Sequence, residues 1–142
     1  MKFDCKIIFS DIDGTFLDSR HQVQPGTAAA ARRMTECGIP VVLVSARMPA
    51  AIRPILRAAG IAAPLISYSG ALVLDAAGRA LYSHTMPVEP AARILNQLQL
   101  RWPQTVVNYY AEDVWYVADD RTPAVQREER ITSVKAVPAE FG

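Results

Sequence analysis

Three short apolar runs, separated by two helix-forming segments, occupy the first half of the chain. In chain order these five segments are residues 6–10, 25–38, 41–44, 49–59 and 64–67. Apolar runs that polar residues do not interrupt are typical of strands buried in a parallel sheet, whose strands need helical crossovers between them. Strand, helix, strand, helix, strand, with right-handed crossovers, is the doubly wound pattern. The sequence therefore predicts an α/β fold with a parallel sheet.

The second half of the chain follows a different pattern. Residues 71–74 and 79–83 flank the turn sequence Asp75-Ala76-Ala77-Gly78, which predicts a hairpin. The elements expected after it are a helix at 88–101 and strands at 106–110, 114–117 and 131–137. This is an α+β pattern, so we expect two domains, residues 1–83 and residues 84–142.

Composition excludes several classes of protein. Fifteen basic and fourteen acidic residues leave a formal charge of +1, so no net field attracts nucleic acid or an anionic membrane. The apolar runs are far too short for a membrane-spanning helix, and the first residues lack the apolar stretch of a signal peptide. Cys5 and Cys37 are too few and too far apart for a disulfide framework. We expect a cytoplasmic protein with buried, reduced thiols.

Two acidic residues directly follow the first predicted strand, in Asp11-Ile12-Asp13-Gly14-Thr15. Ligands of open α/β sheets bind at the carboxyl ends of the strands, and paired carboxylates there repel each other unless a cation or a proton lies between them. Mg²⁺ prefers such oxygen ligands, and Gly14 lets backbone N–H groups turn toward an anion. One carboxylate can attack phosphorus and the other can transfer protons. The alternative is a solvated loop whose acids and glycine are only turn residues.

Polar residues also end the second and third predicted strands. Ser45 stands where a hydroxyl would donate a hydrogen bond to the same phosphate, although it could instead cap the entry to the next helix. Arg47 either holds an anion or forms a surface ion pair. Ser67, Ser69 and Gly70 either line the same crevice or form a plain turn.

These segments resemble the haloacid dehalogenase superfamily of phosphohydrolases. Residues 9–18 (FSDIDGTFLD) resemble its first motif and residues 38–47 (GIPVVLVSAR) its second. Residues 66–71 (ISYSGA) resemble a loop of the Cof-type branch (subfamily IIB), which comprises sugar-phosphate phosphatases with a large inserted cap. The resemblance implies a Rossmann-like core, here incomplete, followed by part of an α+β cap domain.

The resemblance also implies roles for individual residues. Asp11 is then the nucleophile and a magnesium ligand, and Asp13 is the general acid/base and gives its backbone carbonyl to the metal. Ser45 binds the phosphate. Gly14, Thr15 and Arg47 complete the phosphate-binding set that we predict.

The sequence departs from the family in two places within these motifs. Ser45-Ala46 replaces threonine-glycine, and Ser69 replaces the usual asparagine. Serine keeps the hydroxyl, so phosphate binding is expected to survive the first change. The change at Ser69 is expected to alter contacts with the substrate.

Two later features of the family are not found in the 142 residues. One is a lysine that neutralises the phosphate and the nucleophile, and the other is an acidic motif that completes the magnesium site. Lys135 comes too early in the chain, and Asp119-Asp120 lies in a predicted loop. We therefore expect a chain truncated within the cap, with its first strand at an edge of the sheet and available for self-association.

The sequence accordingly favours magnesium-dependent hydrolysis of small phosphomonoesters, such as sugar phosphates, through an aspartyl-phosphate. The alternative is a non-catalytic remnant that keeps the fold and binds a ligand or partner. A phospho-accepting receiver domain is disfavoured, because its acceptor aspartate ends the third strand, where this chain has Ser67.

Overall fold

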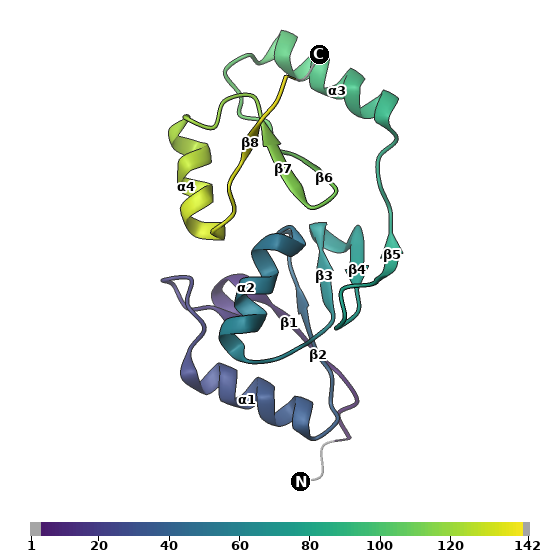
Figure 1. Ribbon diagram of the computed structural model, residues 1–142, viewed down its shortest axis with the longest axis vertical. Helices are drawn as coiled ribbons and strands as arrows, with labels where there is room; N and C mark the ends of the chain where they lie inside the picture. The colour runs from purple at the N-terminus through teal and green to yellow at the C-terminus, as the bar shows by residue number, and fades with distance from the viewer. Residues whose placement is uncertain (1–3, 141–142) are drawn as a thin grey trace. The chain divides into compact units, whose positions relative to one another are not determined.

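The computed structural model describes residues 4–140, and the chain divides into two compact units between His84 and Thr85 (Figure 1). The first unit is built on a sheet with the order β1-β2-β3-β4-β5. Its strands are β1 (Ile8–Asp11), β2 (Val41–Val44), β3 (Leu65–Ser67), β4 (Leu72–Leu74) and β5 (Ala80–Ser83). β1, β2 and β3 are parallel, whereas β4 and β5 form the expected hairpin. The predicted α/β class with a parallel sheet is confirmed.

Two helices connect the parallel strands and pack against each other (Figure 1). They are α1 (Pro25–Glu36) and α2 (Pro49–Ala59), and each begins with proline, whose fixed φ suits the first helical turn. α2 ends at Gly60, which has a φ of 70°, a left-handed conformation that glycine adopts without steric cost. The predicted bounds of α2 are therefore confirmed.

A single apolar cluster lies between the helices and the sheet. It unites side chains from the loop after β1, from both helices and from the strands. The larger buried members are Ile12, Phe16, Leu17, Leu43, Ile52, Ile55, Leu56, Leu65 and Leu74. Each such side chain contributes about 1.5–3 kcal/mol when fully buried. This packing holds the carboxyl ends of β1 and β2 in place.

β1 is an edge strand of the sheet within residues 4–84, as predicted. Ile7, just before it, is 44% exposed, and Phe9 within it is 59% exposed. The opposite edge strand, β5, is also exposed, but its pairing with β4 contains a bulge between Val73 and Leu74. Bulges disfavour edge-to-edge pairing because they twist the strand away from a partner.

The second unit contains a three-stranded sheet and two helices. They are α3 (Val88–Arg101), β6 (Tyr109–Ala111), β7 (Val114–Val117), α4 (Pro123–Thr132) and β8 (Val137–Pro138). The predicted helix at 88–101 is confirmed. The predicted strand at 131–137 is wrong except at Val137, where β8 begins, since α4 reaches Thr132 and residues 133–136 are not in a strand. The missed signal is Thr122-Pro123, where the Thr122 side chain accepts a hydrogen bond from the N–H group of Val125.

Two predictions about burial need correction. Of the aromatic residues expected to form the core of the second unit, Trp115 is buried and donates a hydrogen bond to Asn108, but Trp102 and Tyr110 are exposed. Cys5 and Cys37 are free, as expected, but both are exposed rather than buried.

No helix within residues 4–140 combines the length and the apolar content that crossing a lipid bilayer requires.

We predict that the chain self-associates through β1. An open strand edge with exposed apolar side chains is a template for pairing with another chain. Size-exclusion chromatography with light scattering should show a mass that rises with concentration, and Phe9→Lys should return it to that of the monomer. Leu81→Lys is the matched control, because Leu81 is an exposed apolar residue of the bulged edge strand. A wild-type chain that stays monomeric at high concentration, with a sharp cooperative melt, would contradict this prediction.

Candidate functional site

The loop after β1 presents polar groups between two buried anchors. Residues Ile12–Phe16 form a tight turn, closed by a hydrogen bond from the N–H group of Leu17 to the carbonyl of Ile12, in which Ile12 and Phe16 belong to the apolar cluster. Asp13, Gly14 and Thr15, between these anchors, are exposed. Gly14 has a φ of 76°, which a residue with a side chain would adopt only with strain. The sequence Asp-Gly-Thr is therefore held at the surface by packing on either side.

Parallel pairing brings the ends of β1 and β2 together. Asp11 is the register partner of Val44, and Ser45 is the next residue along the chain. Neighbouring strands lie about 4.7–4.9 Å apart. The backbone of the predicted nucleophile and that of the predicted phosphate-binding serine thus end at the same edge of the sheet.

Ser45 is buried and its backbone is fully engaged. Its N–H group donates to the carbonyl of Ile66 at 2.9 Å, and its carbonyl accepts from the N–H group of Ser69 at 3.1 Å. The Ser45 hydroxyl oxygen accepts a hydrogen bond from the N–H group of Arg47 at 3.1 Å. That contact uses an oxygen lone pair and leaves the hydroxyl hydrogen to donate. The serine can therefore shape the turn and also bind an anion.

A bidentate ion pair between Arg47 and Asp13 joins the second motif to the first. The Arg47 guanidinium donates from Nε to Asp13 Oδ2 at 3.0 Å and from Nη2 to Asp13 Oδ1 at 2.6 Å. The arginine side chain is 10% exposed and the aspartate side chain is 45% exposed. The hydrogen bonds from Arg47 lower the pKa of Asp13, and partial burial opposes them. The structure thus places Arg47 on the predicted acid/base, and its predicted contact with phosphate stays a prediction.

His21 is a neighbour of Asp13 that the sequence analysis did not single out. Its Nδ1 lies 3.3 Å from Asp13 Oδ1, the oxygen that also accepts from Arg47. No local pattern marks this contact, because it depends on a chain reversal between Leu17 and Val23. An isolated histidine in a polar segment gives no signal until that reversal is known.

The segment at the end of β3 contacts the candidate site through its backbone rather than its side chains. Ser67 is fully buried, and its hydroxyl donates to the carbonyl of Leu72 at 3.3 Å, so it serves the hairpin. Tyr68 and Ser69 both have positive φ angles, 50° and 55°. Asparagine is favoured over serine in this conformation, which gives a physical reason for the asparagine of the resembled motif.

The oxygen donors near Asp11 fit a hard cation in part. Within residues 4–140, the carboxylate of Asp11 has no hydrogen-bond or ion-pair partner, and the backbone carbonyl of Asp13 is a second candidate donor. No group of three or more His, Cys, Asp or Glu side chains among the described residues is placed to hold a metal ion. Mg²⁺ commonly binds through only one or two carboxylates and fills its other positions with water and phosphate oxygens. Asp119, in the second unit, accepts hydrogen bonds from Arg121 within a turn.

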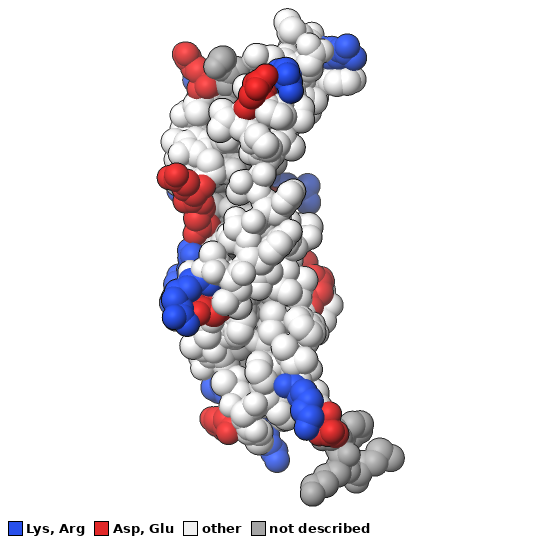
Figure 2. All heavy atoms as spheres, turned by 90° about the vertical axis from the view of Figure 1, so that its right-hand side faces the viewer, with Lys and Arg blue, Asp and Glu red and all other residues white. Residues whose placement is uncertain are grey.

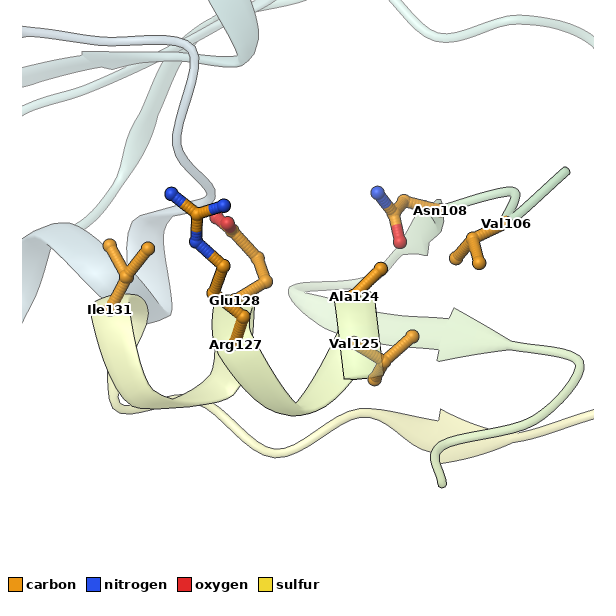
Figure 3. A pocket seen from close by; sticks show the side chains of 7 residues that line it. All are labelled: Val106, Asn108, Ala124, Val125, Arg127, Glu128 and Ile131. Carbon is orange, nitrogen blue, oxygen red and sulfur yellow. The ribbon is translucent and has the colours of Figure 1, made fainter. Parts of the chain in front are cut away.

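A pocket of about 420 Å³ lies in the second unit (Figure 3). Its walls are Val106, Asn108, Ala124, Val125, Arg127, Glu128 and Ile131. None of the predicted site residues lines it. Its Asn108 oxygen is already used by Trp115, and its charged members have opposite sign. The pocket therefore adds no phosphate-binding group to the candidate site.

Charged side chains of both signs are interspersed on the face shown in Figure 2. Blue and red groups lie next to each other at several places on that face.

Comparisons with known proteins show the family of this chain. Residues 8–140 match the family model for haloacid dehalogenase-like hydrolases. A Haemophilus influenzae protein with a phosphatase name is 33% identical over 134 residues, which are 94% of this chain and 50% of that protein. Phosphatase YwpJ of Bacillus subtilis is 35% identical over 107 residues, covering 75% of this chain and 35% of that protein. The chain thus spans half or less of the length of these relatives.

Solved structures show the same fold. A haloacid dehalogenase-like hydrolase from Bacteroides thetaiotaomicron superposes with a TM-score of 0.84 at 21% sequence identity. The match covers 96% of this chain and 52% of that one.

We predict that Arg47→Gln raises the pKa of Asp13 toward its ordinary value of 3.8, because it removes the guanidinium hydrogen bonds. Carbon-13 NMR of the side-chain carboxyl groups during a pH titration measures this directly. A lowered folded-state pKa stabilises the fold above pH 3.8, and this contribution is lost as the pH falls through the lowered value. Arg79→Gln is the control, since Arg79 pairs with the distant Asp75. An Asp13 titration that is the same in Arg47→Gln and wild type would contradict the prediction.

Proposed function

The chain belongs to the haloacid dehalogenase-like hydrolases, and from this we propose that it carries the nucleophile, the acid/base and the phosphate-binding serine of a magnesium-dependent phosphomonoesterase. One observation supports the proposal above the others. The β1–β2 register and the Asp13–Arg47 ion pair bring Asp11, Asp13 and Ser45 to one edge of the sheet. The substrate class that we propose is small phosphorylated metabolites, such as sugar phosphates.

In the proposed reaction a carboxylate oxygen of Asp11 attacks phosphorus while the ester oxygen leaves as the alcohol. Asp13 gives a proton to that departing oxygen, and the phosphoryl group remains on Asp11 as an acyl phosphate. Asp13, now a carboxylate, then takes a proton from the water that attacks the acyl phosphate. Inorganic phosphate is released and both aspartates return to their starting state.

The ion pair favours one of these two roles for Asp13. Arg47 holds the pKa of Asp13 below its ordinary value, so the arrangement in the structure suits the base that activates water. Acid catalysis needs the protonated form, which Arg47 opposes. A phosphate dianion competes with the Asp13 carboxylate for the same guanidinium. This competition is how we reconcile the observed ion pair with a phosphate-binding role for Arg47.

Hydrogen-bond donors near the two aspartates would bind the phosphate group of the substrate. The Ser45 hydroxyl would donate to a phosphate oxygen, as would backbone N–H groups around Gly14 and Thr15. When bound, Mg²⁺ would offset the negative charge that the phosphate brings beside Asp11. The carboxylate of Asp11 and the backbone carbonyl of Asp13 are the residues that we propose hold it.

A second candidate function is binding without turnover. It is favoured by the absence, within the 142 residues, of the later lysine and acidic motif that the family resemblance calls for. A remnant that keeps the Ser45 turn could still bind phosphate. We also propose a cytoplasmic setting and no nucleic-acid or membrane partner, which the near-neutral charge and the two free cysteines support.

We predict that Ser45→Ala weakens the binding of inorganic phosphate by about 10- to 100-fold, the effect of losing a hydrogen bond to a charged group. Isothermal titration calorimetry in the presence of Mg²⁺ measures it. Ser19→Ala, an exposed serine of a nearby loop, is the control and should leave affinity unchanged. Equal affinities in wild type and Ser45→Ala would remove Ser45 from the phosphate site.

We predict that the 142-residue chain hydrolyses p-nitrophenyl phosphate feebly or not at all. Loss of a single charge-stabilising donor costs about 10²–10³ in rate, and both a lysine and part of the metal shell are missing from this segment. Any activity present should require Mg²⁺ and vanish in Asp11→Asn. Turnover at an ordinary enzymatic rate would show that the segment is sufficient. Phosphate binding without turnover would favour the binding function.

A further inference from the structure

His21 is held in place by a closely bonded turn. Leu17 and Val23 form an antiparallel bridge, which reverses the chain after the first motif. Within the reversal, the N–H group of Asp18 donates to the carbonyl of Gln22 at 3.0 Å, and that of His21 donates to the carbonyl of Asp18 at 2.9 Å. The turn is therefore closed by backbone hydrogen bonds at both ends.

The Asp18 carboxylate adds a second set of bonds from inside the turn. Its Oδ1 accepts from the N–H groups of Arg20 and Gln22, each at 2.9 Å. Its Oδ2 accepts from the Gln24 side chain. These contacts leave the backbone on both sides of His21 little freedom.

His21 occupies a backbone conformation that a residue with a side chain rarely adopts. Its φ is 57°, in the left-handed region. Glycine would adopt this conformation without steric cost, and histidine occurs there more often than most residues with a side chain. Tyr68, Ser69 and Ser133 also have a positive φ, so what distinguishes His21 is its contact with Asp13.

The imidazole reaches the one carboxylate that the proposed reaction uses for proton transfer. His21 Nδ1 lies 3.3 Å from Asp13 Oδ1, and Arg47 contacts both oxygens of the same group at 2.6 and 3.0 Å. The two donors come from different segments of the chain. Together they restrict the rotation of a carboxylate that is otherwise half exposed.

We propose that His21 is a positioning residue, which fixes the orientation of the Asp13 carboxylate together with Arg47. The proposal rests on the proposed function, because it is the acid/base role of Asp13 that gives the orientation a purpose. In this role His21 acts only through Asp13.

The first test measures the contact without requiring turnover. In carbon-13 NMR, His21→Gly should shift the side-chain carboxyl resonance of Asp13, although glycine fits the backbone of the turn and should preserve the fold. His21→Gln, which retains a side-chain N–H donor, should shift it less. Gln22→Ala, an exposed side chain on the same turn, should leave it unchanged. An Asp13 resonance identical in His21→Gly and wild type would overturn the proposal.

The second test uses the leaving group and any activity that the chain has. Protonation of the departing oxygen matters most for a basic leaving group. His21→Gly should therefore lower kcat for an alkyl phosphate by about tenfold, the order of one hydrogen bond. It should change kcat for p-nitrophenyl phosphate by less, and KM little for either. Equal losses on both substrates would indicate a merely structural role and would overturn the proposal.

The two tests separate failure of this proposal from failure of the proposed function. If wild type neither hydrolyses these substrates nor binds inorganic phosphate, the proposed function fails for this chain, and the carboxyl resonance still decides whether His21 positions Asp13. If turnover is present and Asp13→Asn abolishes the leaving-group dependence, adding His21→Gly to that variant should cost nothing further, because both changes act on one group.

Discussion

Parallel pairing of β1 with β2 determines where the polar groups of the candidate site lie. Asp11 and Val44 face each other in the sheet, so the loops that follow them emerge at the same edge. The buried side chains of Ile12 and Phe16, on either side of Asp13, fix the loop after β1. The backbone hydrogen bonds of Ser45 with Ile66 and Ser69 fix the loop after β2. A shift of the β1–β2 register would separate Asp11 from Ser45 without changing either local motif.

The two aspartates at this edge of the sheet have different hydrogen-bonding environments. Asp13 carries two neighbouring donors, whereas no side chain of residues 4–140 pairs with the carboxylate of Asp11. The two acids of the motif are therefore not equivalent. The group that has no partner suits nucleophilic attack and cation binding, and the group that is held suits proton transfer in a defined direction. This asymmetry follows from Arg47 and His21, both outside the motif itself.

The chain covers only part of the length of its relatives, and its described sheet has an open edge. The chain matches the haloacid dehalogenase-like hydrolases over almost all of its residues, yet it spans half or less of the relatives compared. The described sheet has an open edge at β1, where exposed Phe9 lies on the strand that leads to the proposed nucleophile, Asp11. What pairs with this edge bears directly on the site, because Asp11 is the last residue of that strand.

The sequence by itself determined the elements and the order in which they occur. Proline and glycine mark the ends of α2, uninterrupted apolar residues mark the parallel strands, and Asp-x-Asp-Gly marks the first loop of the candidate site, because all of these are short-range patterns. A local pattern predicted the wrong element at residues 131–137. Their apolar residues suggested a strand, but the helix that begins after the Thr122 cap continues into them. Only the tertiary structure decided that Arg47 and His21 converge on Asp13, 34 and 8 positions away. Those contacts depend on strand register and on a chain reversal, and neither is encoded in the local pattern around the residues that meet.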